Sequence, residues 1–348
     1  MYGVKKPRRV APIRLSVDTL DLPLKHTFTI ARSSESIART VVVRAAWNAL
    51  DGFGECAPSE RYGESVESVA AELRRVDAGD DPYALERVLA RPMSPGARCA
   101  LDVALHDLIG KDLRRPLWRI FGLDPARTPR TSFTIGIAPL DETLAKVREV
   151  GTHPVIKVKL GTGDEIDTLE AIRAIYRGTI RIDANEGWTP EQSVALLTEL
   201  ARFDVEFCEQ PIPAGTPERL RWIRERSPIQ IVTDEDSKDA SDLPALRGCV
   251  DGINVKLVKC GGIRGALAMI HTARAMGLKI MLGCMVESQI LTCAAAHLSP
   301  LVDWADLDGP FLTAHDPYAG VTYDDGKIVL PDGPGLGVRP AEAALSAS

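Results

Sequence analysis

The chain has 348 residues, 45% of them hydrophobic, and a formal net charge of −6 at pH 7. This length fits either a barrel-sized domain with a smaller one or two ordinary domains, and the acidic balance argues against nucleic acid or an anionic membrane as the main partner. No stretch reaches the apolar length that spans a bilayer, and seven cysteines without paired spacing are typical of reduced thiols, so we expect a soluble cytoplasmic protein.

The first third of the chain predicts a β-meander followed by helices. Residues 39–58 hold two strand-like runs around Asp51-Gly52, a dipeptide suited to a tight hairpin turn. Residues 64–76 and 97–113 have apolar residues at helical spacing, for example Leu101, Leu105 and Leu108.

From about residue 130, short β-rich runs alternate with amphipathic helical segments. The runs are TSFTIGI, PVIKVKL, TIRIDAN, VEFCEQP, IQIVTDE, GINVKLV, KIMLGC and VDWADLD. Eight strands that alternate with helices predict a parallel α/β barrel. An open, doubly wound sheet is the alternative, weakened because no G-x-G-x-x-G or P-loop follows the first run. The tail at residues 321–338 is predicted to return to the first domain as an edge hairpin.

Charged residues recur at the carboxyl ends of these runs, where barrels of this kind build their active sites. On the sixth run, side-chain alternation turns Asn254 and Lys256 inward. Successive steps along the series from Lys159 to Lys256 are 24, 26, 25 and 22 residues, about one β-α unit each, so the pattern predicts one shared mouth. The charged residues are Lys157, Lys159, Asp183, Glu209, Asp234, Lys256, Asp306 and Asp308.

Asp183, Glu209 and Asp234 form a cluster of oxygen donors on three adjacent predicted strands. Hard oxygen ligands without histidine or thiolate favour Mg²⁺ or Mn²⁺ over zinc. Each acid on its own also fits a cap of the helix that follows it. Taken together, and opposite converging lysines, the three acids predict a metal site.

Lys159 and Lys256 lie four strands apart in an eight-stranded barrel, with the acids on the arc between them. A substrate bound there would have an amine on each face. Lysine acts as a base near neutral pH only when burial or a neighbouring cation lowers its pKa, and Lys157 supplies such a cation. The alternative, in which Lys157 and Lys159 form outward salt bridges, conflicts with the apolar residues that flank them.

The motifs KVK, DANEGW, EQP, TDED, INVKLVKCGGI and DLDGP, in this order, resemble the muconate-lactonizing subgroup of the enolase superfamily. Within it, they look most like the dipeptide epimerases that act on L-Ala-D/L-Glu. The likeness extends to LPLKHTFTIARSSES and GECAPSERYGES near the amino terminus. It implies a (β/α)7β barrel at residues 129–312 and an α+β capping domain formed by residues 1–128 and the returning segment 313–348.

The resemblance also implies a role for each matching residue. Arg32 matches an arginine on the capping loop that binds the glutamate side chain, and forked donors suit that role. Lys259 then falls outside the mouth. Asp236 departs from the serine common in the family, and it either contacts the metal ligands from behind or faces solvent. The implied roles are Mg²⁺ ligation by Asp183, Glu209 and Asp234, acid/base catalysis by Lys159 and Lys256, and substrate binding by Arg32, Thr134, Lys157, Asp306 and Asp308, the last two receiving the α-ammonium group.

The reaction implied is a two-base 1,1-proton transfer at the α-carbon of the dipeptide's carboxyl-terminal residue, through an enediolate stabilised by Mg²⁺. N-acylamino acid racemisation, o-succinylbenzoate synthesis and cycloisomerisation are the closest alternatives, and none of them needs a D-x-D for an ammonium. A Schiff-base aldolase or a metal-binding barrel without catalysis are more distant ones. The resemblance implies a small-molecule partner and a role in recycling murein peptides of the cell wall. A homo-oligomer is compatible with the sequence.

Overall fold

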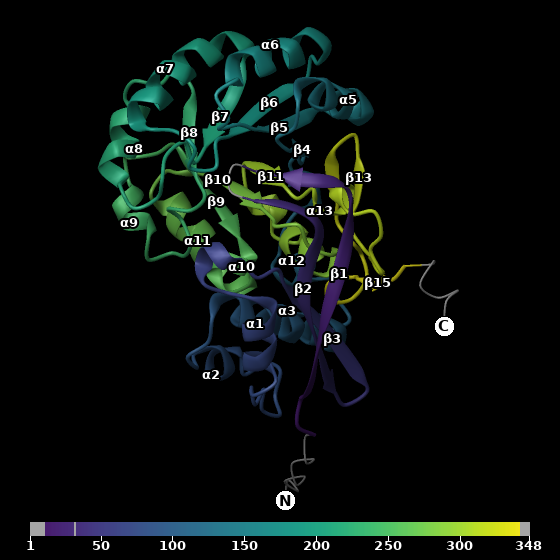
Figure 1. Ribbon diagram of the computed structural model, residues 1–348. Helices are drawn as coiled ribbons and strands as arrows, with labels where there is room; N and C mark the ends of the chain where they lie inside the picture. The colour runs from purple at the N-terminus through teal and green to yellow at the C-terminus, as the bar shows by residue number, and fades with distance from the viewer. Residues whose placement is uncertain (1–10, 31–32, 342–348) are drawn as a thin grey trace, which may run out of the picture.

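The computed structural model describes residues 11–30 and 33–341, and its first part is a three-stranded antiparallel sheet (Figure 1). The strands are β1 (Arg14–Thr29), β2 (Ser34–Trp47) and β3 (Leu50–Cys56), in that order across the sheet. Alternate residues of β2 serve two cores, because Val41 and Val43 pack with the amino-terminal helices and Val42 packs with the barrel. The sheet therefore joins the two parts of the molecule.

The turn between β2 and β3 lies at Asn48-Ala49, so the predicted turn at Asp51-Gly52 is wrong. Trp47 pairs with Leu50, and Asn48 has a φ of 53°, which asparagine adopts more readily than most residues. Gly52 lies inside β3, where an added Cβ would overlap the Ala104 carbonyl oxygen. Its lack of a side chain serves the close approach of a helix, and a turn is not needed there.

That helix is α3 (Pro95–Asp112), the longest of the amino-terminal part. It begins where the Ser94 hydroxyl accepts a hydrogen bond from the Ala97 N–H, with Pro95 in the first turn. Leu101, Leu105 and Leu108 are fully buried, which confirms the predicted apolar face. The other helices here are α1 (Val66–Leu73), α2 (Leu85–Leu89) and α4 (Leu117–Ile120), with short 3-10 turns at Glu60–Tyr62 and Pro125–Arg127.

Eight parallel strands follow and neighbour one another in chain order, so the predicted barrel is confirmed and the open doubly wound sheet is wrong. In Figure 1 the helices cover the outside of this sheet. The strands are β4 (Phe133–Ile135), β5 (Val155–Lys159), β6 (Thr179–Asp183), β7 (Val205–Glu209), β8 (Gln230–Thr233), β9 (Gly252–Lys256), β10 (Lys279–Gly283) and β11 (Trp304–Asp306).

The intervening helices bury one apolar side against the strands, as their periodicity predicts. The longest, α11, has Ala266, Met269, Ile270 and Ala273 on its buried face. The helices are α5 (Leu140–Val150), α6 (Glu165–Ile175), α7 (Pro190–Leu200), α8 (Pro217–Arg224), α9 (Leu243–Leu246), α10 (Leu257–Cys260), α11 (Ile263–Ala275), α12 (Gln289–Ala296) and α13 (Gly309–Leu312), with 3-10 turns at Ala201–Phe203 and Ser299–Leu301.

The barrel closes between its last and first strands through a short seam just before β4. Thr131 bridges to Ala305 in parallel fashion, and the Ser132 N–H donates to the Ala305 carbonyl oxygen at 3.1 Å. The Thr131 hydroxyl accepts the Leu307 N–H at 2.7 Å. Side chains as well as backbone groups therefore hold the seam.

Strand register places the predicted site residues at one height. Lys159 pairs with Asp183, and Asp183 pairs with Glu209 on the next strand. On the other side of the barrel, Gly283 of β10 pairs with both Lys256 and Asp306. The ends of these strands therefore meet at one mouth, as the spacing along the chain predicts.

The carboxyl-terminal segment holds β12 (Tyr318–Ala319), β13 (Thr322–Asp324), β14 (Lys327–Val329) and β15 (Arg339–Pro340). The strands β13 and β14 pair with each other, and Lys327 bridges to Arg130 just before β4, so the predicted edge hairpin on the amino-terminal sheet is wrong. The segment touches the amino-terminal helices further on, where Leu336 N donates to Asp107 at 2.8 Å.

The domain limits at residues 128/129 and 312/313 stay predictions. A capping domain built from residues 1–128 and 313–348 requires contacts between these two segments, and the hydrogen bond from Leu336 to Asp107 of α3 is one of them. Across residues 11–30 and 33–341, no helix is long and apolar enough to cross a membrane.

Candidate active site

A cavity of about 200 Å³ lies between the mouth of the barrel and the amino-terminal part. The amino-terminal part forms the upper wall with both apolar and polar side chains, and charged side chains of the barrel form most of the floor. The upper wall includes Leu24, Phe28, Ile30, Arg61 and Tyr62, and the floor includes Lys157, Lys159, Asp234, Lys256, Asp306 and Asp308.

Lys157 is the most deeply buried charge of the floor, with 1% of its surface exposed. Its Nζ lies 2.5 Å from Glu209, 2.8 Å from Asp306 and 3.1 Å from Asp183. Burial alone would lower the pKa of Lys157, but the three carboxylates outweigh it and hold that pKa well above the ordinary value. Lys157 is therefore an ammonium group paired with three acids, and the predicted effect of its charge on Lys159 stays a prediction.

Lys159 extends from the end of β5 to the first acid of the series. Its Nζ donates to Asp183 Oδ2 at 2.6 Å, and Asp183 Oδ1 accepts the Asn185 N–H at 2.9 Å. Burial alone would raise the pKa of Asp183, whereas the Lys159 and Lys157 ammonium groups lower it far below the ordinary value. Asp183 is therefore a permanent anion held between two lysines.

Lys256 mirrors this arrangement from the end of β9. Its Nζ donates to Asp234 Oδ2 at 2.8 Å. Burial lowers the pKa of Lys256, but the Asp234 carboxylate more than offsets this and raises it. Lys259 contacts the other oxygen, Oδ1, at 2.5 Å. It does not line the cavity, in agreement with its predicted place outside the mouth, but it reaches one of the predicted metal ligands.

Lys159 and Lys256 come from opposite sides of the mouth. Three strands, β6, β7 and β8, separate β5 from β9 in the sheet order. The three predicted metal ligands, Asp183, Glu209 and Asp234, sit at or just beyond the ends of these three strands. The structure therefore brings together the two lysines and the three acids in the order that the sequence predicts.

The three acids fit a hard divalent cation in their chemistry. Burial and the Asp183 carboxylate raise the pKa of Glu209, so the acids repel one another. Glu209 Oε2 is buried and faces the Lys157 ammonium group at 2.5 Å. In the described part of the chain no three acidic, histidine or cysteine side chains are gathered as a ready metal site. Coordination by Asp183, Glu209 and Asp234 therefore requires their oxygens to turn away from the lysines.

Asp306 and Asp308, predicted as a pair, have different partners. Asp306 is fully engaged, since Ser132 Oγ donates to Oδ1 at 2.5 Å and Lys157 contacts Oδ2. Asp308 Oδ2 accepts the Thr134 N–H at 2.7 Å. Burial and the neighbouring Asp306 raise the pKa of Asp308 to about 6. A cationic ligand would therefore stabilise the anion of Asp308 more than that of Asp306, which is already paired with Lys157.

Several contributors were not predicted. Asn254, predicted only to face inward, donates from Nδ2 to Glu209 Oε1 at 2.7 Å. Ser132 holds Asp306, and the Cys284 thiol lies 3.7 Å from Asp308 Oδ1. Inward alternation along a strand is the only sequence signal for Asn254, and no signal points to Ser132 or Cys284.

Arg32 lies outside the described residues, so its predicted contact with a substrate carboxylate stays a prediction. Another arginine of the amino-terminal part, Arg61, lines the same cavity. It donates to both carboxylate oxygens of Glu186, at 2.9 and 3.1 Å. This pair fastens the amino-terminal part to the loop after β6.

The Asp236 carboxylate is hydrogen-bonded within the protein and does not simply face solvent. Its Oδ2 accepts from Gln210 Nε2 at 2.8 Å, and its Oδ1 accepts the Gly215 N–H at 2.7 Å. The Gln210 side-chain oxygen accepts the Asp234 N–H at 3.0 Å. Of the two alternatives, the structure therefore favours a contact behind the acids, because Asp236 holds the residue that supports Asp234.

Comparison with known proteins matches nearly the whole chain to one family. Residues 13–122 match the amino-terminal domain of mandelate racemase and muconate lactonizing enzyme, and residues 140–344 match the enolase carboxyl-terminal domain-like family. An L-Ala-D/L-Glu epimerase of Bacteroides thetaiotaomicron is 38% identical over 91% of this chain and 85% of its own length.

Two solved structures share the fold closely. An enolase family member from Agrobacterium tumefaciens with homology to dipeptide epimerases, bound to sodium and L-Ala-L-Glu, is 36% identical and has a TM-score of 0.85 over 93% of this chain and 99% of its own. The dipeptide epimerase of Methylococcus capsulatus, complexed with Mg and L-Arg-D-Lys, is 34% identical and has a TM-score of 0.87 over 94% and 99%.

A barrel mouth with opposed lysines, a series of acids and a covering sheet defines a protein with the enolase fold. The chain belongs to the mandelate racemase and muconate lactonizing enzyme family of the enolase superfamily, and its relatives there include dipeptide epimerases.

Proposed function

We propose that the protein is an isomerase that epimerises L-Ala-L/D-Glu at the α-carbon of the glutamate residue. The observation that carries this proposal is the opposition of Lys159 and Lys256 across the arc of strands β6 to β8. Inversion at one carbon by proton transfer needs a base on one face and an acid on the other. Both groups are present here.

The Asp306–Asp308 pair supports a dipeptide with a free amino group. A buried carboxylate at the cavity wall is an anionic partner for an ammonium group. N-acylated substrates, succinylbenzoate precursors and muconates lack that group, so this feature weighs against the sister reactions. Asp308 would receive the ammonium, and Asp306 would remain tied to Lys157 and Ser132.

Asp183, Glu209 and Asp234 would hold Mg²⁺, or Mn²⁺ in its place. The ion supplies positive charge beside the substrate carboxylate, which stabilises the negative charge that develops when the α-proton leaves. Relatives solved with Mg support this assignment. The chain's own contribution is to keep the acids anionic, through Lys159 at Asp183 and Lys256 at Asp234.

In the proposed reaction one lysine, in its neutral form, takes the α-proton from one face of the carbon. The opposite lysine, in its ammonium form, delivers a proton to the other face. The roles exchange in the reverse direction. Among the described residues, Lys159 Nζ donates to Asp183, and Lys256 Nζ donates to Asp234 and lies 4.0 Å from the sulfur of Met285.

Relatives differ in the dipeptides for which they are named, including hydrophobic and Lys/Arg types. A different dipeptide is therefore the second candidate for this protein. The likeness to the Bacteroides thetaiotaomicron enzyme and to the Agrobacterium tumefaciens structure with L-Ala-L-Glu favours the glutamate substrate. The cytoplasmic location and a role in recycling cell-wall peptides stay predictions.

A dipeptide library incubated with the protein and Mg²⁺ in D₂O tests the proposal, with deuterium uptake at the α-carbon measured by mass spectrometry. We expect Ala-Glu to exchange fastest and to yield both epimers. Exchange only in other dipeptides would overturn the glutamate assignment and keep the chemistry. No exchange in any dipeptide would overturn the epimerase itself.

A further inference from the structure

Lys259 is a buried cation behind the mouth, with a side chain that is 0% exposed. It lies on α10, the single helical turn that follows Lys256 directly. Its Nζ contacts Asp234 Oδ1 at 2.5 Å and the carbonyl oxygens of Asp234, Ser237 and Asn254 at 2.6, 3.0 and 3.1 Å. An ammonium group has three N–H donors, so four acceptors occupy all of them.

Asp234 is consequently held by two lysines, Lys256 at the end of β9 and Lys259 on the helical turn that follows. Lys259 contacts Oδ1 and Lys256 contacts Oδ2 at 2.8 Å. Because Lys259 also donates to the Asp234 backbone oxygen, it fixes both ends of this residue. Only Oδ2 is left to face the cavity, and its direction sets where the Lys256 amine can lie.

The turn that carries Lys259 is itself held from outside by α3. Val258 packs in the core of the amino-terminal part. Gly261 and Gly262 lie so close to α3 that an added Cβ would overlap Arg98 and Asp102, respectively. This packing holds the turn that carries Lys259 closely against α3.

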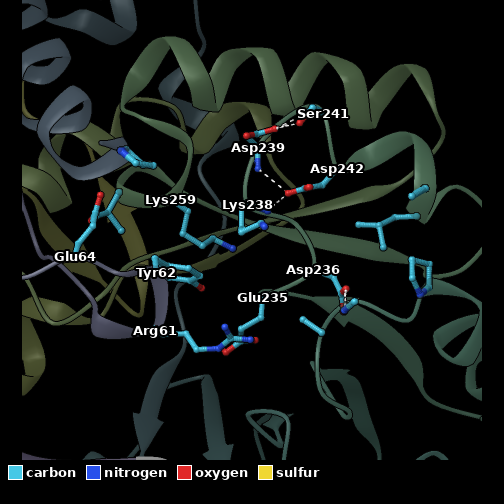
Figure 2. Close-up of a pocket in the computed structure, with 17 residues that line it drawn as sticks. Arg61, Tyr62, Glu64, Glu235, Asp236, Lys238, Asp239, Ser241, Asp242 and Lys259 are labelled. Atoms are coloured by element: carbon cyan, nitrogen blue, oxygen red, sulfur yellow. Dashed lines mark hydrogen bonds between the residues drawn. The ribbon is translucent and has the colours of Figure 1, made fainter. Parts of the chain in front are cut away.

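We propose that Lys259 is a positioning residue that orients Asp234 and, through Asp234, aims Lys256 at the substrate. This inference rests on the proposed epimerase function. Lys259 does not line the catalytic cavity; it lines the larger neighbouring cavity of about 780 Å³, where its side chain extends between Tyr62 and Lys238 (Figure 2). It therefore acts on the reaction only through the acid that it holds.

The competing explanation is that Lys259 merely ties three carbonyl groups together and stabilises the loops after β8 and β9. The two explanations differ in what Lys259→Met would change. If Lys259 only stabilises the loops, Lys259→Met should lower the stability of the protein and affect both catalytic lysines alike. A positioning residue would disturb the Asp234 and Lys256 side of the mouth and spare the Lys159 side, which it does not contact.

Deuterium wash-in separates these outcomes, because it reports proton removal from each epimer of Ala-Glu separately. Lys159→Ala and Lys256→Ala define which epimer each lysine deprotonates. Lys238→Met is the matched control, since Lys238 lines the same large cavity as an exposed lysine without a recorded contact to Asp234. Calorimetric titration with Mg²⁺ alone gives a second readout that does not depend on turnover.

At a Mg²⁺ concentration that saturates the variant, we expect Lys259→Met to lose wash-in from the Lys256-dependent epimer and to retain it from the other. Its Mg²⁺ affinity, measured separately, should fall by about 10- to 100-fold, as is usual for residues that orient metal ligands. Lys238→Met should match the unmodified protein in both assays. Equal loss from both epimers at saturating Mg²⁺ would overturn the proposal.

Lys259→Arg decides the question if Lys259→Met does not fold. A planar guanidinium keeps the charge but cannot direct its donors to the same four oxygens, so the same one-sided loss is expected. Wild-type exchange of both epimers by this variant would overturn the proposal. If the unmodified protein exchanges no dipeptide, the proposed function fails, and that result is distinct from either outcome for Lys259.

Discussion

Arg61 and Glu186 form a bidentate ion pair between the amino-terminal part and the barrel, with N–O distances of 2.9 and 3.1 Å. Glu186 Oε1 also accepts the Ala214 N–H at 2.8 Å. One carboxylate therefore connects the covering loop, the loop after β6 and the loop after β7. Glu186 therefore connects the upper wall of the cavity to the loops that follow two of the acid-bearing strands.

Replacing Arg61 with lysine should impair substrate binding more than folding. The charge remains, but one of the two parallel hydrogen bonds is lost. A partly exposed pair is worth about 1 kcal/mol, which corresponds to a roughly fivefold rise in KM. Steady-state kinetics and a thermal melt check this. Arg44→Lys, which alters the exposed Arg44–Asp51 pair on the sheet, should leave KM unchanged.

Removing either catalytic lysine should abolish epimerisation without abolishing all exchange. Lys159→Ala and Lys256→Ala each delete one acid/base group, and such groups contribute about 10²- to 10⁴-fold to rate. Each variant should still exchange deuterium into the one epimer whose proton the remaining lysine removes. Full racemisation by either variant, followed by polarimetry or chiral chromatography, would contradict the two-base assignment.

Asp308 should control the acidic limb of the pH profile of kcat/KM. Burial and Asp306 raise its pKa to about 6 in the unliganded protein, and only the anion pairs with an ammonium group. As pH falls through about 6, Asp308 gains a proton and kcat/KM should fall. In Asp308→Asn this limb should disappear at a lower overall kcat/KM, and a limb that persists unchanged would assign it to another group.

Chelation should remove activity and Mg²⁺ should restore it. The three acids repel one another in the described structure, and burial together with Asp183 raises the pKa of Glu209. We expect EDTA to stop deuterium exchange and Mg²⁺ or Mn²⁺ to recover it. Exchange that continues in EDTA, combined with borohydride trapping of a ketone substrate, would favour the Schiff-base alternative.

His297 should make stability depend on pH. This buried histidine accepts the Trp118 N–H at 3.3 Å through Nδ1 and donates from Nε2 to the Leu336 carbonyl oxygen at 3.1 Å. Burial lowers its pKa to about 4, from an ordinary value of 6.5. The unfolded chain binds a proton first, so stability is complete above pH 6.5 and is lost as pH falls toward 4.

The size of this loss is roughly 3 kcal/mol, because one pKa unit corresponds to about 1.4 kcal/mol. Urea unfolding at several pH values measures it. His297→Gln should be less stable near pH 7.5 but should show a flatter dependence between pH 6.5 and 4. His26→Gln, at the exposed His26–Glu149 pair, is the control and should keep the full slope.

The barrel and the placement of its charges were predictable because they depend on short-range regularities. Alternation within a strand turned Lys256 and Asn254 inward, and a repeat of about one β-α unit aligned Asp183, Glu209 and Asp234. Each regularity holds within one structural unit of the chain, so no knowledge of distant contacts was needed.

Contacts between units of the chain were not predictable. The partners of Lys157 come from β6, β7 and β11, and no local pattern shows that three acids surround it. Gly52 looked like a turn residue because its closeness to α3 is not visible in sequence. Lys259 was placed outside the mouth, and no local pattern shows that the following helical turn brings it to Asp234.

The seam that closes the barrel has a consequence for ligand recognition. Ser132 and Thr134, at the start of the first barrel strand β4, donate hydrogen bonds to Asp306 and Asp308, at and beyond the end of the last barrel strand β11. An amino group bound to these acids would thus neutralise negative charge at the seam between β4 and β11. Binding of a dipeptide should draw these two strands together, so that ligand binding and barrel closure stabilise each other.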